Sequence, residues 1–337
     1  MINPQDWSTN DTKGSHAIVA DVGGTNARFC RVDLRNWFVD RIEVYPCAHF
    51  PSLVAALTFY QKEQGFSEIK HIAIAIACPV TSDLVRMTNF HWQFSIADMK
   101  YQLGVSQLQV MNDFTAAAMS LPLLSANDKV QIGQGIADLS KSMVVLGAGT
   151  GLGVAHLIPA DDEFIALAGE GGHATWAAQT EQEWFIQRYL SEQFGHVSCE
   201  RLLSGPGLEN LYLALAAYQQ KQVSALSAEE ITALALSRQC ELASATVEQF
   251  FASLGSYAGD LALSLGALGG VFIAGGIVPK LLPLLELSEF RTRFEAKGRS
   301  SAFNRQIPTY VIVAEQPGLL GAAAYLKQVM VRESYVI

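Results

Sequence analysis

The sequence predicts an α/β protein of two domains, and three observations lead to this prediction. The chain has 337 residues, and at one domain per roughly 150 residues this length favours two domains. Segments typical of strands and of helices alternate in both halves of the chain, as in α/β proteins. A strand, a glycine-rich turn and a second strand occur once in each half, at residues 17–34 and 143–157. The two similar hairpins indicate an internal duplication with one hairpin per domain.

The first half of the chain contains elements that end at recognisable turn or cap residues. The helix over 95–103 begins with a Ser95…Asp98 capping arrangement and stops at Gly104. Residues 71–77 alternate Ile with Ala, so both faces are apolar and a central buried strand is expected. Besides the first hairpin, the expected elements of this half are a helix over 51–64, a strand over 71–77, a helix over 95–103, a strand over 108–111 and a helix from Phe114.

The second half is mostly helical. A Ser227…Glu230 pair predicts the start of one of its helices. After the second hairpin, the expected elements are helices over 180–194, 206–219, 227–239 and 242–267, a strand over 270–274, a helix after Pro279, a strand over 309–314 and a helix over 318–330.

One stretch, Leu261 to Pro279, has nineteen residues without a charge and is long enough to suggest a membrane span. It contains five glycines, two adjacent pairs among them, so one continuous helix is unfavourable. No Lys/Arg flank or aromatic belt accompanies it. We expect a helix end, the buried strand 271–274, and a Gly275-Gly276 turn into a new helix.

The composition excludes several classes of protein. Charged residues make up 16% of the chain, hydrophobic residues 50%, and the net charge is −9. This hydrophobic content is incompatible with disorder. An acidic balance without a basic cluster argues against nucleic acid and against an anionic membrane surface as partners.

The N-terminus and the cysteines indicate a cytoplasmic protein. Residues 1–15 contain no apolar run, so no signal peptide is expected. The five cysteines are an odd number at wide spacings without a Cys-x-x-Cys pair, which argues against a disulfide framework and against a zinc ribbon. Reduced thiols in the cytoplasm are the default.

The two glycine turns, 21–28 and 147–153, have the composition of phosphate-binding loops. Glycines expose consecutive backbone N–H groups and let a ligand approach closely, and each turn adds a Thr hydroxyl. Either turn alone could be a tight structural hairpin; two matched copies favour phosphate binding. No Gly-Lys dipeptide occurs, which excludes a Walker A loop. A dinucleotide fingerprint fails because Leu152 and Val154 occupy the positions that require glycine.

A few polar residues stand at places where function and structure are both reasonable explanations. Asn112-Asp113 follows a strand, at the edge where α/β sheets bind ligands, although Asp is also a good N-cap. The segment 169–173 places Glu170 and His173 among glycines, which suits a loop that presents polar groups to a small polyol. Glu200 could be a solvated residue, and Asn89 a turn former.

Eight motifs in order resemble those of the bacterial glucokinase family, in the sugar-kinase branch of the hexokinase–actin–Hsp70 superfamily. The resemblance extends from about residue 17 to residue 326. The motifs lie at 21–28, 74–79, 87–89, 112–115, 147–153, 169–173, 203–207 and 272–279. The resemblance implies the two-domain actin-like ATPase (ribonuclease H-like) fold, with a cleft between a smaller and a larger α/β domain. The small domain would cover 14–122, completed by the C-terminal helix 315–334, and the large domain 123–314.

The resemblance also implies roles for individual residues. Asp113 matches the catalytic base. The residues that match sugar contacts are Asn89, Asn112, Asp113, Glu170, His173 and Glu200. Those that match the nucleotide site are Asp21, Gly23, Gly24, Thr25 and Asn26 of the first hairpin, Gly149, Thr150 and Gly151 of the second, and the adenosine turn Gly275-Gly276. Asp21 would contact Mg²⁺ through water.

The implied activity is ATP-dependent phosphorylation of D-glucose at the 6-hydroxyl, giving glucose 6-phosphate and ADP. It requires Mg²⁺ and belongs to glycolysis in the cytoplasm, and the family commonly forms homodimers. The helix N-terminus is expected to lower the pKa of Asp113, and domain closure around the sugar is expected to exclude water.

One departure from related proteins is informative. Sugar kinases and repressors of the ROK group carry a Cys-x-Cys-Gly zinc motif after the His of the 169–173 loop, whereas His173 is followed here by Ala-Thr-Trp. We therefore expect no structural zinc. Only sixteen residues precede the first strand, which is too short for the DNA-binding domain of the repressors.

Three alternatives stay open at this stage. The nearest is a kinase for another hexose, mannose or fructose, on the same fold. A non-catalytic sugar sensor is a second, which Asp113 and the missing DNA-binding segment argue against. A nicotinamide dehydrogenase is a third, which the absent fingerprint argues against.

Overall fold

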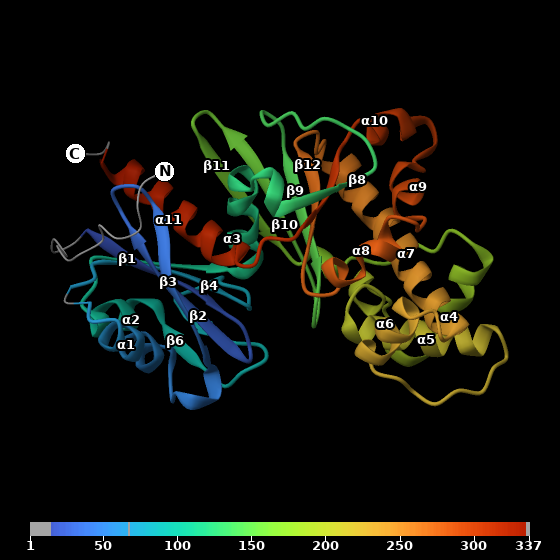
Figure 1. Ribbon diagram of the computed structural model, residues 1–337, viewed down its shortest axis with the longest axis horizontal. Coiled ribbons are helices and arrows are strands. Elements are labelled where there is room, and N and C mark those ends of the chain that lie inside the picture. Colours follow the sequence, from blue (N-terminus) through green and yellow to red (C-terminus); the bar gives the residue numbers. More distant parts are fainter. Residues whose placement is uncertain (1–14, 67, 335–337) are drawn as a thin grey trace. The chain divides into compact units, whose positions relative to one another are not determined.

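The computed structural model describes residues 15–66 and 68–334. The segment 1–14, where no signal peptide is expected, lies outside the described residues. The chain divides into two compact units (Figure 1). Unit 1 contains the chain up to Ser120 and returns at Gln316, and unit 2 runs from Leu121 to Glu315.

Unit 1 is built on a five-stranded sheet of order β3-β2-β1-β4-β7. Strands β1, β2 and β3 are antiparallel neighbours, whereas β4 and β7 run parallel to β1. The strands are β1 (His16–Val22), β2 (Asn26–Asp33), β3 (Phe38–Pro46), β4 (His71–Ile76) and β7 (Gln107–Asn112). A separate pair is formed by β5 (Leu84–Arg86) and β6 (Gln93–Ser95).

Helices cover both faces of this sheet, and β4 shows why. Its isoleucines, such as Ile74, pack into the cluster that includes α1 (Leu53–Glu63) and α2 (Ile96–Leu103). Its alanines, Ala73 and Ala75, face α11 (Pro317–Ser334), which packs beside α3 (Asp113–Ser120). Small side chains on this face allow the helices to approach closely. The predicted central strand at 71–77 is confirmed.

The helix starts in unit 1 follow the expected capping chemistry. The Ser95 side chain accepts a hydrogen bond from the backbone N–H of Asp98, and Gly104 ends the helix with φ +62°. Ser52 caps α1 in the same way. These bonds satisfy N–H groups that the first turn leaves unpaired.

Unit 2 repeats the sheet of unit 1. Its order is β11-β10-β9-β12-β13-β8, and its first five strands have the same directions as β3-β2-β1-β4-β7. Strand β8 is added antiparallel to β13. The strands are β8 (Lys129–Ile132), β9 (Met143–Ala148), β10 (Leu152–Ala160), β11 (Glu163–Gly169), β12 (Gly270–Ala274) and β13 (Thr309–Ile312). The shared topology bears out the predicted duplication.

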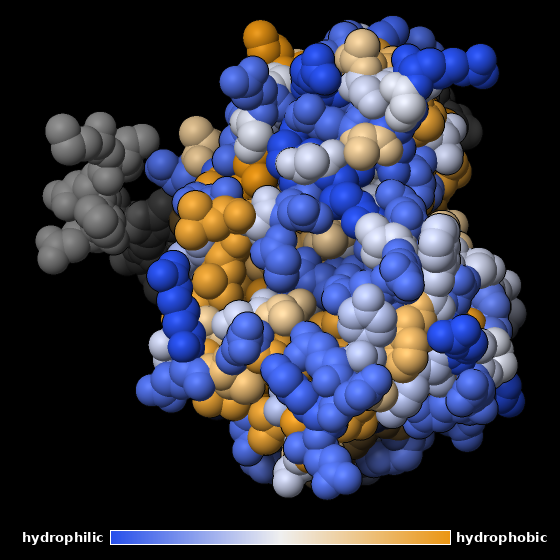
Figure 2. Space-filling view, turned by 90° about the vertical axis from the view of Figure 1, so that its right-hand side faces the viewer, coloured by the Kyte–Doolittle hydropathy of each residue, from blue (hydrophilic) through white to orange (hydrophobic). Residues whose placement is uncertain are grey.

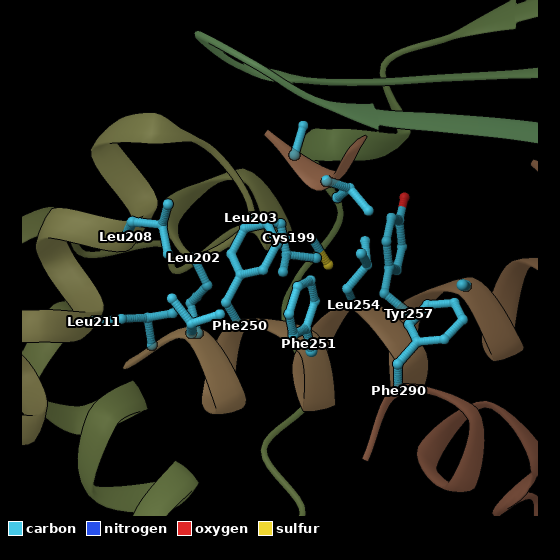
Figure 3. Packing of buried hydrophobic residues seen from close by; sticks show 14 of the residues in the cluster. Cys199, Leu202, Leu203, Leu208, Leu211, Phe250, Phe251, Leu254, Tyr257 and Phe290 are labelled. Atoms are coloured by element: carbon cyan, nitrogen blue, oxygen red, sulfur yellow. The ribbon is translucent and has the colours of Figure 1, made fainter. Parts of the chain in front are cut away.

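The longest helix of unit 2, α7, packs against α5, α6, α9 and α10. Phe250, Phe251 and Leu254 project from it into the main core (Figure 3). The helices are α4 (Glu181–Phe194), α5 (Gly205–Tyr218), α6 (Ala228–Leu236), α7 (Glu241–Leu265), α8 (Leu282–Leu285), α9 (Phe290–Glu295) and α10 (Ser301–Arg305). The 3₁₀ helices of the two units are η1 (Cys47–His49), η2 (Leu121–Leu123), η3 (Ala126–Asp128), η4 (Gly171–His173), η5 (Cys199–Arg201), η6 (Val278–Leu281) and η7 (Gly298–Ser300).

The uncharged stretch 261–279 is interrupted as predicted, with one difference. Helix α7 ends at Leu265, Gly266 follows with φ +59°, and β12 is buried along its whole length. The helix expected after Pro279 is instead the 3₁₀ helix η6 followed by the four-residue α8. Pro283 at the start of α8 lacks the N–H that a continuous helix would use. None of the helices among the described residues has the length and apolar character of a membrane span.

Polar residues cover most of the face shown in Figure 2, with apolar residues in smaller groups between them. The two units bury long, continuous apolar clusters. The low charge content therefore corresponds to a large buried interior.

Candidate functional site

The first glycine turn joins β1 to β2 as a hairpin in unit 1, as predicted. Asp21 pairs with Arg28 in the strand register, and the N–H of Gly23 donates to the carbonyl of Asn26 at 2.9 Å. A Cβ on Gly24 would lie 3.1 Å from the Cβ of Asn89, so the missing side chain lets the loop that carries Asn89 lie against the turn. Asn89 itself is exposed.

Asn112 is the last residue of β7, and both polar atoms of its side chain form hydrogen bonds. Its amide nitrogen Nδ2 donates to the carbonyl of Cys78 at 3.3 Å, and its Oδ1 accepts from the N–H of Phe114 at 2.9 Å. The first bond crosses to the segment that follows β4. Asn112 therefore connects the ends of two neighbouring parallel strands, the edge at which the sequence predicts ligand binding.

Asp113 is the first residue of α3, and its environment differs from the prediction. Burial, and next the charge of Asp21, raise the pKa of Asp113 to about 6, and nearby N–H donors such as that of Phe114 oppose this only in part. The expectation that the helix N-terminus lowers this pKa is wrong, because desolvation of the carboxylate outweighs it. The carboxylate accepts from the N–H of the next residue, Phe114, at 3.0 Å, whereas an N-cap bonds two or three residues ahead.

Asp21 lies at the end of β1 and contacts the beginning of α11. Its carboxylate is 3.6 Å from the guanidinium of Arg28. A Cβ on Gly318 would lie 3.1 Å from the Asp21 carboxyl carbon, so glycine lets the first turn of α11 approach this carboxylate. Burial raises the pKa of Asp21, and Arg28 partly offsets that effect. Sequence reasoning missed Gly318, because its role depends on a strand three hundred residues earlier.

The second glycine turn joins β9 to β10 in unit 2 and is held by two outside contacts. The carbonyl of Gly149 accepts from the N–H of Gly205 at 2.8 Å. The N–H of Leu152 donates to Oε2 of Glu200 at 2.8 Å. A Cβ on Gly151 would lie 2.5 Å from the same oxygen, so glycine leaves the space that Glu200 occupies. Glu200 thus bonds directly to the hairpin, which the sequence did not indicate.

The loop that carries Glu170 and His173 packs against this hairpin. It forms η4 directly after β11, and a Cβ on Gly172 would lie 2.0 Å from the carbonyl oxygen of Leu152. The Glu170 and His173 side chains are 64% and 59% exposed, and Nε2 of His173 lies 4.0 Å from Oε2 of Glu170. Cys199 donates its N–H to the carbonyl of Ala174 at 2.9 Å, which joins the loop to η5 and Glu200. Unit 2 therefore gathers Glu170, His173 and Glu200 around Leu152.

A pocket of about 730 Å³ opens beside the second hairpin, within the size range of ligand sites. It brings together Gly149, Thr150 and Gly276, three of the residues predicted for the nucleotide. Gly275 lies beneath it with φ +89°, and a Cβ there would lie 2.3 Å from the Ala148 carbonyl oxygen. The other lining residues are Gly205, Pro206, Leu208, Glu209, Ser227, Ala228, Glu229, Thr232, Ala233, Leu236, Ile277, Lys280 and Leu281.

Several of these lining residues were not predicted. Lys280 contributes a positive charge, and the first turns of α5 and α6 face the pocket, where helix N-termini favour anions. The capping residue Ser227 was visible in the sequence as a helix start. Its position beside the hairpin depends on how α6 packs, which sequence spacing does not report.

Comparisons with known proteins identify the family. The family model described as glucokinase matches residues 18–329. A glucokinase of Photorhabdus laumondii is 45% identical over 313 residues, which cover 93% of this chain and 97% of that protein. The chain belongs to the glucokinase family. It is accordingly a hexose kinase, an enzyme of the transferase class, and its function is that of a glucokinase, as the eight motifs imply.

Solved structures of glucokinases share the fold. The crystal structure of a glucokinase from an Antarctic psychrotroph superimposes with a TM-score of 0.87 at 38% identity, covering 94% of this chain and all of that one. A ROK-family glucokinase of Streptomyces griseus, solved with glucose and AMPPNP, gives a TM-score of 0.61 at 19% identity, with 93% and 99% coverage. The predicted actin-like ATPase fold class is confirmed.

The raised pKa of Asp113 makes a prediction about stability. The folded state holds the Asp113 proton up to about pH 6, whereas the unfolded chain releases it near pH 4, so folding stability falls as pH rises between these values. At pH 8 we expect Asp113→Asn to have a higher free energy of unfolding than the parent, by on the order of 1–3 kcal/mol, and a higher melting temperature. The gain should shrink at pH 4. Thermal melts of both proteins across this range measure it, and a gain that does not depend on pH would contradict the assignment.

Proposed function

We propose that this glucokinase transfers the γ-phosphoryl group of ATP to the 6-hydroxyl of D-glucose, with Asp113 as the general base. The observation that carries the proposal is a partly buried carboxylate directly after a parallel strand, whose pKa desolvation raises to about 6. A base with a pKa just below neutral pH is ionised in the cell and still accepts a proton effectively. It is a stronger base than the helix N-terminus alone would allow.

Asp113 would accept the proton of the attacking hydroxyl. Phosphoryl transfer through a loose transition state depends mainly on positioning and on charge stabilisation, so the proton can move late. The fixed side chain of Asn112, bonded to Cys78 and Phe114, would orient the sugar beside the base.

The remaining sugar contacts are assigned to Asn89 in unit 1 and to Glu170, His173 and Glu200 in unit 2. Carboxylates and an imidazole can form hydrogen bonds with the hydroxyls of a hexose. A site built to bond a hydroxyl strongly disfavours an analogue that lacks it. The glucokinases among the relatives, and the glucose bound in the Streptomyces griseus structure, support glucose as the substrate.

ATP would occupy the pocket beside the second hairpin. Thr150 and Gly151 would bind phosphate oxygens through backbone N–H groups, beside Gly149, whose own N–H donates to the Gly151 carbonyl and closes the turn. Lys280 would add a charge that a P-loop lysine supplies elsewhere. Adenosine would lie at Gly275-Gly276. Glu209 and Glu229 also line the pocket, and their carboxylates would accept hydrogen bonds from ribose hydroxyls, whereas they would repel phosphates. The turn of the first hairpin, from Gly23 to Asn26, is assigned to the terminal phosphates.

The chemistry of Asp21 and Asp113 fits a divalent cation. The charge of Asp21 raises the pKa of Asp113, so the two carboxylates repel each other, and among the described residues Arg28 forms an ion pair with Asp21. Mg²⁺ is usually bound by one or two carboxylates together with waters and substrate phosphates. Asp21 would hold it through water, and when bound it would offset phosphate charge.

Further assignments rest on the resemblance. We propose a cytoplasmic homodimer that acts in glycolysis and needs no zinc, with a small domain over 14–122 and 315–334 and a large domain over 123–314. The proportion of dimer can be measured by sedimentation.

A panel of hexoses tests the substrate assignment. With ATP and Mg²⁺, we expect kcat/KM to be highest for glucose, and the product to carry its phosphate on the 6-hydroxyl. A higher kcat/KM for mannose or fructose would replace glucose as the substrate while leaving the kinase assignment intact. Binding of sugar without any ADP formation would instead indicate a sensor.

Removal of the base should affect turnover more than binding. We expect Asp113→Ala to lower kcat by roughly 10²–10⁴-fold, because proton transfer from the hydroxyl loses its acceptor. Calorimetry should still detect glucose binding by this variant. Near-normal kcat at saturating substrates would exclude Asp113 as the base.

Filling the pocket at the second hairpin should remove only the nucleotide. No atom lies within 4 Å of a Cβ built on Gly149, so valine can be accommodated by the protein and would project into the space assigned to phosphates. We expect Gly149→Val to abolish ADP binding in calorimetry and to leave glucose binding largely intact. Retained ADP binding would argue against the pocket, and an unchanged melting temperature serves as the folding control.

A further inference from the structure

Tyr257 is a core residue of α7 whose hydroxyl group leaves the core. The residue is 8% exposed, and its ring lies among the apolar side chains around α7. Figure 3 shows its oxygen pointing away from the helix. The hydroxyl donates to the carbonyl oxygen of Gly171 at 2.6 Å. The chemistry proposed above makes no use of this tyrosine.

The hydrogen bond reaches the middle of the loop between Glu170 and His173. The Gly171 carbonyl also accepts from the N–H of Ala174 at 2.9 Å, the bond that closes the η4 turn. A carbonyl oxygen has two lone pairs, so Tyr257 satisfies the one that the turn leaves free. A Cβ on Gly171 would lie 2.9 Å from the tyrosine oxygen, so this close approach requires glycine.

The loop also makes contacts through its own backbone at Gly172, His173 and Ala174, one of them with the His196 side chain. Gly172 lies against the Leu152 carbonyl, and the His173 carbonyl accepts from Nε2 of His196 at 3.1 Å. Ala174 is bonded to Cys199. Tyr257 contributes a side-chain contact between these points, next to the exposed Glu170.

We propose that Tyr257 is a positioning residue for sugar recognition, which fixes the Gly171 peptide and thereby the direction of Glu170 and His173. This inference rests on the proposed function of those two residues. Tyr257 acts through the loop and touches no substrate itself. Burial raises the pKa of Tyr257, so its hydroxyl remains a donor at every pH at which the enzyme works.

The test replaces Tyr257 with Phe, which removes the hydroxyl and keeps the ring. We expect the Kd for glucose, measured by calorimetry without nucleotide, to rise about 2- to 10-fold, the equivalent of one hydrogen bond. The Kd for ADP should stay within twofold, because Tyr257 does not line the nucleotide pocket. The preference for glucose over mannose in kcat/KM should fall, since a less fixed loop discriminates epimers less well.

Tyr212→Phe is the matched control. Tyr212 is a buried tyrosine of the same unit, on α5, and its hydroxyl interacts with Cys240. If Tyr257 were merely structural, both variants would lower the melting temperature and neither would change glucose binding selectively. We expect Tyr212→Phe to leave both Kd values within twofold of the parent.

Gly171→Ala provides a second variant with Tyr257 in place, because the added Cβ would press on the tyrosine oxygen. The same selective loss of glucose affinity is expected. An unchanged glucose Kd in either folded variant, or an equal rise in both Kd values, would overturn the proposal. Glucose binding by the parent protein tests the proposed function, whereas the ratio of variant to parent tests the role of Tyr257.

Discussion

The arrangement of unit 2 depends on direct backbone contact at glycine residues around one hairpin. The loop with Glu170 and His173 approaches through Gly172, which lies on the carbonyl of Leu152, and the Gly275 turn approaches through the carbonyl of Ala148. A single methyl group at either glycine would overlap backbone atoms that cannot move independently. Because these loops pack directly on the main chain of the hairpin, they have little room to move toward it.

Glu200 adds a polar contact to the same hairpin. One of its carboxylate oxygens accepts from the N–H of Leu152, and Gly151 leaves the room for it. A residue assigned to the sugar is thereby bonded to the loop assigned to phosphate. The sugar and phosphate roles proposed for unit 2 are therefore linked through this hydrogen bond, and a shift of the hairpin would also move Glu200.

The sequence predicts those parts of the fold that repeat an apolar pattern or begin with a capping residue. The strand at 71–77, the helix from Ser95 and the buried strand 271–274 are examples. Edge strands such as β3 (38–46) are not predicted, because β3 is largely exposed and its side chains follow no apolar period. The helix expected after Pro279 is present as α8, but it has only four residues and follows a 3₁₀ helix, with Pro283 at its start.

The site is predictable as a set of residues but not as an electrostatic environment. The sequence places Asp113 at a strand end, yet the rise in its pKa comes from burial and from Asp21, ninety residues earlier. Likewise, α6 contributes to the pocket only through tertiary packing. Distances and desolvation between distant segments are the information that local patterns lack.

The duplicated topology explains why the two units can carry different chemistry. In each unit the hairpin and the next parallel strand end at the same edge of the sheet, so both copies offer a glycine turn there. In unit 1 the last parallel strand, β7, continues directly into α3 and places Asn112 and Asp113 at that edge. In unit 2 the corresponding strand, β13, is followed by the chain's return to unit 1 as α11. The helix that follows the last parallel strand of unit 2 is therefore α11, which belongs to unit 1 and whose first turn meets Asp21 through Gly318. Unit 1 thus places Asn112 and Asp113 at a strand–helix junction of its sheet, whereas in unit 2 the hairpin turn borders the pocket.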